Sequence, residues 1–382
     1  MSNLTALVAG GGIGGLATAA ALAQRGWAVT VYERQDQLRA VGAGIYIWEN
    51  GLRVLEALDA FDDATADAFH GTHFEQRDNT GGIIDSAPIG GGQRLLTVPR
   101  SQLLAALHKA CEKADVKIVT STEVTGANAR GELFFAGGDS ASADLAVGVD
   151  GVWSKVRETL GLERSHEQTI EGALRTMVRA APGDFGADDV GKYLECWNGS
   201  RRFLVTPVNQ AQTYLALTCP DTDSRACAIP VDKAVWRESF PQWSHLIDRI
   251  GEFPINWGVY SVTRCSAWSA GRTAIVGDAA HAQTPNLGQG GGMAMQNGLA
   301  LAVRLESVQD RRDIPDALEA WEAGEREIVE HCQRWASLYG EVTHLPDDVR
   351  TRAIQGAMSD PWVAGQVFRA ANHAPLGTLP AK

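Results

Sequence analysis

The feature that most constrains the fold is a glycine-rich turn near the start of the chain, between two short apolar segments. Residues 4–10 predict a buried strand, and the spacing G-x-G-x-x-G follows at Gly10, Gly12 and Gly15. An alanine-rich helix and a second strand that ends in Glu33 come next. Strand, glycine turn, helix, strand and a terminal acid in this order are typical of a dinucleotide-binding βαβ unit.

Each part of this unit matches one part of a dinucleotide. Glycines lack a Cβ, so their backbone N–H groups can approach a pyrophosphate at the positive end of the following helix. The acid at the end of the second strand is placed to bind ribose hydroxyls. The predicted contacts with the dinucleotide are Gly10, Gly12, Ile13, Gly14, Gly15, Glu33 and Arg34.

A second glycine-rich stretch, GDAAHAQTPNLGQGGGMAMQN, occupies residues 277–297. The apolar segment before it predicts a strand with Asp278 at its carboxyl end, and the glycines open an apolar helix whose positive end favours a phosphate, a ribityl hydroxyl or an anionic ring. A nicotinamide dehydrogenase gives no reason for this second unit, whereas FAD is long and needs separate anchors for its ribityl and isoalloxazine parts. The predicted flavin contacts are Gly277, Asp278, Pro285, Gly288, Gly290, Gly291 and Gly292.

Two further motifs stand between these stretches. The sequence DLAVGVDGVWSKVR has an apolar strand followed by Asp150 and a polar helix start, and VPRSQLLAAL places Arg100 before a helix. With the two glycine stretches, they resemble the single-component FAD aromatic hydroxylases, the para-hydroxybenzoate hydroxylase-like family, over nearly the whole chain. The resemblance implies that Asp150 and Arg100 contact the flavin and that His281 has a structural role. The chain departs from the family at Val149, where alanine is usual, and at Gln296 and Asn297, where an acid is common.

A narrower resemblance concerns the substrate. The segment GAGIYIWENGLRVLEAL and the spacing of later arginines are similar to 2-methyl-3-hydroxypyridine-5-carboxylic acid oxygenase and its relatives, which act on hydroxypyridine carboxylates. This resemblance implies substrate contacts from Arg175, Arg202 and Tyr214. A guanidinium forms a planar fork that matches a carboxylate in a dry pocket. The alternative for each arginine is a solvated strand residue or a buried structural ion pair.

Other candidate substrate contacts are a tyrosine, a histidine and a proline. Tyr46 follows a glycine-rich turn and is expected to contact the ring or the substrate, with core packing as the alternative. His73 stands where the relatives have a tyrosine, so it is a candidate for a hydrogen bond to a ring hydroxyl, although a lone histidine is more often structural or exposed. The candidate catalytic residues are His73 and Tyr214, and Pro285 is assigned to the substrate as well as to the flavin.

The expected fold class is α/β: an FAD-binding Rossmann-like domain, an inserted β-sheet substrate domain and a C-terminal helical segment. Strand-like alternation of apolar and polar residues predicts the substrate domain, and a long amphipathic helix from about residue 315 to 339 is expected to pack on the flavin domain. The predicted ranges are 1–70, 92–168 and 269–345 for the FAD-binding domain, 71–91 and 169–268 for the substrate domain, and 346–382 for a C-terminal tail.

Composition excludes several other classes of protein. The formal net charge of -12 over 382 residues argues against a nucleic-acid surface, which needs a basic face. Six cysteines without a C-x-x-C pair, no basic leader and no apolar run of about 18 residues predict a cytoplasmic protein with reduced thiols and no membrane segment. The histidines and cysteines show no metal-ligand spacing. We expect a monomer or homodimer.

The family resemblance also implies a reaction. NADH or NADPH reduces FAD, O2 gives a flavin C4a-hydroperoxide, and oxygen is transferred to an electron-rich ring. The expected substrate is a hydroxylated N-heteroaromatic carboxylate, 5-hydroxynicotinate-like or another 3-hydroxypyridine carboxylate, and the expected reaction is hydroxylation. The alternatives are ring-opening oxygenation of such an acid, a hydroxybenzoate or salicylate substrate, a nicotinamide dehydrogenase without flavin, and a non-catalytic FAD-fold binding protein.

Overall fold

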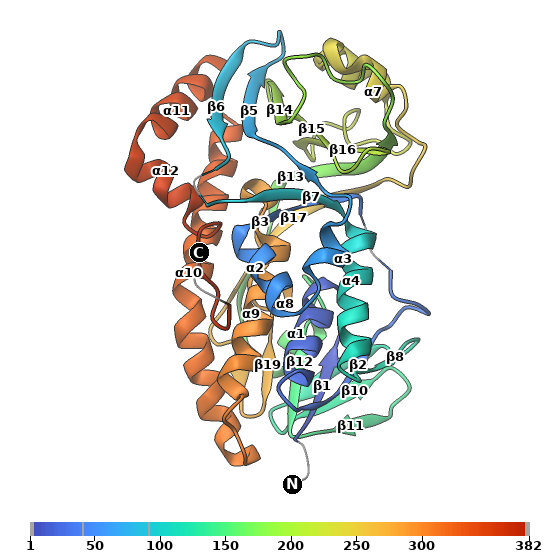
Figure 1. Cartoon of the computed structure of the whole chain (residues 1–382), viewed down its shortest axis with the longest axis vertical. Helices are drawn as coiled ribbons and strands as arrows, with labels where there is room; N and C mark the ends of the chain where they lie inside the picture. Colours follow the sequence, from blue (N-terminus) through green and yellow to red (C-terminus); the bar gives the residue numbers. More distant parts are fainter. Residues whose placement is uncertain (1–3, 40–41, 91, 379–382) are drawn as a thin grey trace.

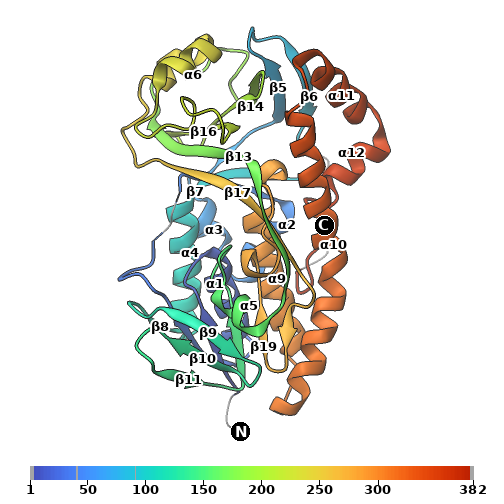
Figure 2. The same ribbon diagram turned by 180° about the vertical axis from the view of Figure 1, so that it is seen from behind.

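The computed structural model describes residues 4–39, 42–90 and 92–378. A mostly parallel sheet with the strand order β18-β19-β12-β1-β2-β8 lies at one end of the molecule, and a mostly antiparallel sheet with the order β17-β13-β16-β15-β14-β5-β6 lies at the other (Figure 1). The long helix α10 (Ile314–Thr343) runs along the side of both sheets (Figure 2). The predicted α/β class, with a Rossmann-like sheet, an inserted antiparallel sheet and C-terminal helices, is confirmed.

The parallel sheet brings three of the predicted motifs to one edge. β1 (Thr5–Ala9) pairs with β12 (Leu145–Gly148), and β12 pairs with β19 (Thr273–Ile275), all in parallel. Because the carboxyl ends of parallel strands meet at the same edge, the segments that begin at Gly10, Val149 and Val276 emerge side by side. This edge is where an open α/β sheet binds its ligand.

Two helices pack closely beside that edge. α1 (Ile13–Ala23) is rich in alanine and fully buried along its middle, and α9 (Gly290–Leu305) lies against it. The approach is close because small residues line the contact: a Cβ at Gly298 would lie 2.2 Å from the Thr18 hydroxyl oxygen, and one at Gly14 would lie 3.1 Å from the Ala294 Cβ. Both helices therefore begin at the same sheet edge.

Smaller elements complete this part of the chain. A short sheet of β3 (Gly44–Trp48), β7 (Leu95–Pro99) and β4 (Phe69–His70) lies between the two large sheets. The remaining strands are β2 (Ala28–Tyr32), β8 (Lys117–Val119), β9 (Val124–Asn128), β10 (Glu132–Phe135), β11 (Ser140–Ser142) and β18 (Ser269–Ala270). The remaining helices are α2 (Glu49–Ala57), α3 (Phe61–Thr65), α4 (Arg100–Lys113), α5 (Lys155–Leu160), α8 (Asp278–His281) and the short helices η2 (Pro285–Leu287) and η3 (Arg311–Asp313).

The antiparallel sheet has two different faces. Apolar residues on one face, such as Leu174, Phe203 and Leu217, pack under α6 (Lys233–Ser239), η1 (Pro241–Trp243) and α7 (Ser244–Ile247). The alternate residues point toward the parallel sheet, as period-two alternation requires. The strands are β5 (His73–Asp78), β6 (Ile83–Pro88), β13 (Glu163–Arg179), β14 (Lys192–Asn198), β15 (Arg201–Pro207), β16 (Gln212–Pro220) and β17 (Asn256–Cys265).

The structure differs from the predicted organisation in two places. The boundary predicted at residue 169 falls inside β13, which is one continuous strand from Glu163. The segment predicted as a tail instead forms α11 (Asp347–Ser359) and α12 (Pro361–Phe368) over most of its length, while residues 379–382 lie outside the described chain. In the described ranges, no helix is long and apolar enough to cross a membrane.

Candidate active site

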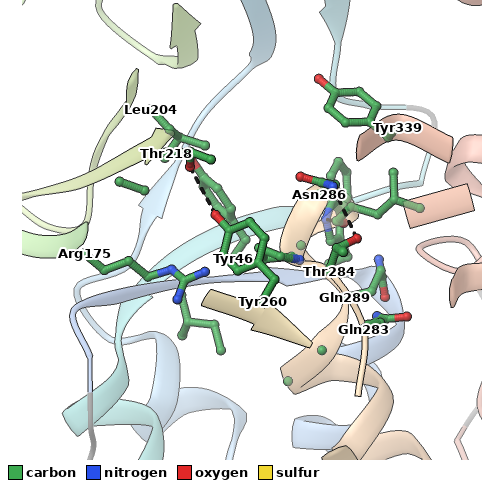
Figure 3. A pocket seen from close by; sticks show the side chains of 18 of the residues that line it. Tyr46, Arg175, Leu204, Thr218, Tyr260, Gln283, Thr284, Asn286, Gln289 and Tyr339 are labelled. Carbon is green, nitrogen blue, oxygen red and sulfur yellow. Dashed lines mark hydrogen bonds between the residues drawn. The ribbon is translucent and has the colours of Figure 1, made fainter. Parts of the chain in front are cut away.

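A cavity of about 760 Å³ lies between the two large sheets. One end is lined by the glycine turns, the middle by the inner face of the antiparallel sheet, and the far side by α11, α12 and the residues after them. The close-up shows Arg175 on one side of this cavity and Tyr339 on the other, with the loop that carries Asn286 between them (Figure 3). The cavity thus extends from the edge of the parallel sheet, where the glycine motifs lie, to the inner face of the antiparallel sheet and the C-terminal helices.

The glycine end has two kinds of glycine. Gly10, with φ +106°, and Gly15 shape the turn itself, since a Cβ at Gly15 would lie 1.9 Å from the Gly10 carbonyl oxygen. Gly12 lines the cavity, and a Cβ there would meet no protein atom within 4 Å. Gly12 therefore leaves room for something other than the protein. The predicted cofactor residues that line the cavity are Gly12, Ile13, Gly14, Arg100, Asp278, Pro285, Gly288, Gly290 and Gly291.

The other predicted cofactor residues lie beside the cavity wall or away from it. Glu33 accepts a hydrogen bond from the Gly11 N–H at 2.8 Å, which fixes the turn. Asp150 accepts from the Lys155 N–H at 2.7 Å and so begins α5, while its Oδ1 atom is buried without a hydrogen-bond partner among the described residues. Arg34 is exposed. The glycines that serve packing are Gly10, Gly15 and Gly277. Gly292 lies outside the cavity lining, and a Cβ there would lie 3.5 Å from its nearest neighbour, an ordinary contact.

Arg100 and Asp278 are charged residues on the cavity wall. Arg100 begins α4, and its Nε atom is buried with no hydrogen-bond partner in the described part of the chain. Burial lowers the pKa of Arg100, and the nearby Arg175 lowers it further. Asp278 faces the cavity, yet the surrounding protein raises the pKa of its carboxyl group, an effect that Arg100 opposes. Both groups are therefore poised to gain from a polar ligand.

Arg175 projects from β13 into the middle of the cavity. Its guanidinium carbon lies 5.4 Å from the centre of the Tyr260 ring. Burial lowers the pKa of Arg175, but the tyrosines Tyr260 and Tyr214 raise it by more, so the net shift is upward. The strongest neighbours of this cation are thus aromatic hydroxyl groups rather than carboxylates.

Arg202 also lines the cavity, but it already has an acidic partner. Its Nη1 atom donates to Glu195 at 3.1 Å and its Nη2 atom donates to Asn286 at 2.9 Å. Arg202 is 6% exposed and Glu195 3%, so this is a buried ion pair. Glu195 also accepts from Tyr339 at 2.8 Å and from Gln76 at 3.0 Å. The structure therefore favours the structural alternative for Arg202 over the predicted contact with a substrate carboxylate.

Two predicted aromatic residues meet at the cavity. Tyr46, on β3, shares a hydrogen bond of 2.5 Å with the Thr206 hydroxyl, and its ring stands edge-on to Tyr214 at 6.3 Å. Tyr214 lies on β16 against Gly44, where a Cβ would come within 2.9 Å of the tyrosine side chain. Burial raises the pKa of Tyr214, and Arg175 and Arg100 oppose that shift. Tyr214 therefore remains a hydroxyl donor at neutral pH.

The prediction for His73 needs correction. His73 begins β5, and its Nδ1 atom shares a hydrogen bond of 3.0 Å with the Thr72 hydroxyl on the sheet's outer side. Because successive side chains of a strand point to opposite faces, Phe74 and Gln76 line the cavity and His73 does not. The structure does not support contact between His73 and a substrate.

Gln296 and Asn297, which stand where the resembled family often has an acid, bind a carboxylate from another helix. Glu325 on α10 accepts from the Gln296 amide at 3.0 Å and from the Asn297 amide at 2.9 Å. The Asn297 side chain also shares a hydrogen bond with His281, and burial lowers the pKa of His281 to about 4. His281 is therefore a neutral residue that contacts the middle of α9.

The cavity also contains residues that sequence reasoning missed. The C-terminal helices were given no role, although the i, i+4 spacing of Ala353 with Ala357 and of Ile354 with Met358 is the pattern of one apolar helix face. Tyr260, on β17, was missed because an aromatic residue in an apolar strand gives no separate signal. The cavity-lining residues from the C-terminal segment are Ala353, Ile354, Ala357, Met358, Val367, Phe368 and Ala371.

Comparison with known proteins gives consistent matches over most of the chain. Residues 3–336 match the model of the FAD binding domain family. The 2-heptyl-3-hydroxy-4(1H)-quinolone synthase of Mycobacteroides abscessus is 38% identical over 353 residues, 92% of this chain and 93% of that protein. The 6-hydroxynicotinate 3-monooxygenase of Pseudomonas fluorescens is 26% identical over 79% of this chain and 82% of its own. The tetrameric form of 2-methyl-3-hydroxypyridine-5-carboxylic acid oxygenase has a TM-score of 0.89 and 34% identity, and covers 100% of this chain and 99% of its own.

Proposed function

The chain belongs to the FAD-binding monooxygenases of the para-hydroxybenzoate hydroxylase-like family, and on that premise we propose that it hydroxylates the ring of a 4(1H)-quinolone. FAD is its cofactor, and NAD(P)H is the reductant typical of the family. A 4(1H)-quinolone is the benzo-fused form of a hydroxypyridine. The proposal thus keeps the predicted N-heteroaromatic ring and replaces the predicted carboxylate with a ring oxygen.

The glycine end of the cavity has the groups that FAD needs. Gly12 leaves space where a Cβ would otherwise project, and the first N–H groups of α1 and α9 are available to a pyrophosphate and to a flavin carbonyl. The partnerless Nε of Arg100 and the carboxyl of Asp278 supply a donor and an acceptor there. Bound in this cavity, FAD supplies the electrons from NAD(P)H and the activation of O2.

One observation carries the choice of ring. Among the described residues, Arg175 has aromatic hydroxyl neighbours and no ion pair with an acid, whereas the charge of Arg202 is matched by Glu195. Arg175 and Arg100 both lie near the Tyr214 hydroxyl. With Arg100 assigned to the flavin, Arg175 is left beside Tyr214 to bind one oxygen atom on a ring. Arg175 and Arg202 both line the cavity, and the predicted two-arginine clamp would require Arg202 to leave Glu195.

The reaction follows from the chemistry of that oxygen. When a 4-quinolone loses its N–H proton, negative charge collects on the oxygen at C4 and electron density rises at C3. Arg175 and Tyr214 stabilise this anion by a charge and a hydrogen bond. The C3–H is replaced by C3–OH, one atom of O2 enters the ring, and the other leaves as water with two electrons from NAD(P)H. Tyr46 and Tyr260 hold the ring by apolar and edge-on contacts.

The comparisons support this choice without deciding it. The quinolone synthase relative has the higher sequence identity, while the hydroxypyridine-carboxylate oxygenase covers the whole chain in structure. A hydroxypyridine carboxylate remains the second candidate, because Arg175 alone can still bind one carboxylate.

Substrate-stimulated oxidation of NADH and NADPH tests the proposal. The purified FAD-loaded enzyme is mixed in turn with 4(1H)-quinolones, 5-hydroxynicotinate, 2-methyl-3-hydroxypyridine-5-carboxylate, 4-hydroxybenzoate and salicylate, and product masses are recorded. We expect strong stimulation by a quinolone, with a gain of one oxygen atom at C3. Stimulation by a pyridine acid alone would replace the quinolone by the second candidate, and a gain of both atoms of O2 would indicate ring opening.

Asp278→Asn is expected to weaken FAD binding. The Asp278 side chain is exposed to the cavity in the protein without cofactor, so the melting temperature of the apoprotein should change little. Loss of a charged hydrogen-bond acceptor should weaken FAD binding about tenfold or more. Unchanged flavin affinity would remove Asp278 from the cofactor site.

A further inference from the structure

The far side of the cavity is an apolar lobe. Its wall is built by the end of β3, by β5, β6 and β7, by the last turn of α10, and by α11, α12 and the residues that follow. The residues of the apolar lobe are Trp48, Phe74, Ala87, Leu95, Val342, Ala353, Ile354, Ala357, Met358, Val367, Phe368 and Ala371. A wall of this composition and extent is larger than a bare pyridine or quinolone ring needs.

The polar groups next to the apolar lobe are mostly occupied by one another. Gln76, Tyr339 and Arg202 all donate hydrogen bonds to the Glu195 carboxylate. Asp85 lines the cavity nearby, and burial raises the pKa of its carboxyl group, which favours the neutral form. These groups therefore offer little to a charged ligand, and the lobe favours an uncharged, flexible, apolar one.

The apolar lobe is held firmly by the rest of the fold. Arg350 on α11 is 1% exposed, donates to the Gly199 carbonyl at 2.7 Å and lies 4.8 Å from the Trp197 ring centre. On the other side, the Trp48 and Phe368 rings stand edge to face at 5.7 Å. The Asn50 N–H donates to the Ala371 carbonyl at 3.1 Å, which ties the residues after α12 to α2. The lobe is thus a preformed compartment.

We propose that the apolar lobe binds an alkyl chain on the substrate ring, and that the cavity-facing side of α11 sets the length of chain that the enzyme accepts. This inference rests on the proposed function, because it places a ring at Arg175 and directs its substituent toward Tyr339 (Figure 3). Ala353 and Ala357 are the small residues of that helix face, so they leave the space, while Ile354 and Met358 limit it. The ligand class is therefore a 4-quinolone with a saturated chain on its ring.

The test compares 2-heptyl- and 2-methyl-4(1H)-quinolone with the FAD-loaded enzyme. Dissociation constants are measured by calorimetry without NAD(P)H, and KM is measured with it. The heptyl chain is longer than the methyl group by several methylenes, and each buried methylene strengthens binding about fourfold. Burial of only two of them would therefore make the heptyl compound bind the wild type about tenfold or more tightly than the methyl compound. Ala357→Trp should remove that preference and leave the affinity for the methyl compound within about twofold.

Two further variants make the result specific. Arg352→Trp places the same side chain on the exposed side of α11, where the arginine is 67% exposed, and should retain the heptyl preference. Met358→Ala enlarges the apolar lobe and should shift the preferred chain from heptyl to nonyl, and it provides the test if Ala357→Trp does not fold. Equal affinity of the wild type for both quinolones would overturn the proposal, as would equal weakening of both by Ala357→Trp.

Failure of the ring assignment would be distinguishable from failure of the apolar lobe. If the wild type hydroxylates no quinolone, the proposed function is wrong, and binding of 4-heptylphenol is then compared with binding of 4-methylphenol. Tighter binding of the heptyl compound, removed by Ala357→Trp and kept in Arg352→Trp, would support the lobe with another ring. Equal binding of the two phenols would overturn it.

Discussion

Arg175→Met should lower kcat for a 4-quinolone by about 100- to 1000-fold, with little change in the melting temperature. The size of the effect is that of removing one preorganised group from a developing oxyanion. Stability should hold because the strongest neighbours of this arginine are tyrosine rings, so its removal leaves no buried carboxylate unpaired. Steady-state kinetics and thermal unfolding of the FAD-loaded variant measure the two effects separately.

The matched variant Arg202→Met should behave in the opposite way. It leaves Glu195 buried without its cationic partner, and breaking a buried ion pair in this way costs about 3–5 kcal/mol of unfolding free energy. The hydrogen bonds from Tyr339 and Gln76 remain, so the loss should fall near the lower end of that range. Adding Glu195→Gln to Arg202→Met should recover part of the loss. If the Arg202→Met enzyme is stable, and if it binds rings with a carboxylate more weakly but other rings equally well, Arg202 would return to the predicted substrate contact.

Gly12→Ala should fold like the wild type and fail to retain FAD, whereas Gly15→Ala should damage the fold itself. A Cβ at Gly12 meets no protein atom within 4 Å and projects into the cavity, so the cofactor alone would encounter it. A Cβ at Gly15 would lie 1.9 Å from the Gly10 carbonyl oxygen, so the backbone must move. Flavin absorbance after purification and the unfolding midpoint of the apoprotein separate the two cases. Full flavin content in Gly12→Ala would mean that the dinucleotide does not pass over this residue.

The parts that could be predicted are those whose signal is local. The βαβ unit could be predicted from its glycine spacing and from the apolar strand on each side. The flavin stretch could be predicted from the glycines at the start of a helix. Gly15, which shapes the turn, was predicted together with Gly12, which lines the cavity, because the sequence pattern does not separate the two roles.

The parts that could not be predicted depend on contacts distant in the sequence. Arg175 on β13 and Arg202 on β15 have the same sequence pattern, and the two strands are separated by β16. Only the ion pair with Glu195 on β14 makes Arg202 structural. Successive residues of β5 point to opposite faces of the sheet, so Phe74 faces the cavity and His73 points away from it. The C-terminal segment has short apolar stretches whose importance appears only when α11 and α12 close against β6 and Trp48.

The position of α11 and α12 in the chain has a consequence for the range of substrates. The FAD binding domain match ends at residue 336, before either helix begins, while Arg175 and the glycine turns all lie within it. If the apolar lobe sets the accepted chain length as proposed, substitutions on the cavity-facing side of α11 would change the range of substrates and leave Arg175 and the glycine turns intact. The same segment is then a natural unit for grafting between relatives in the laboratory.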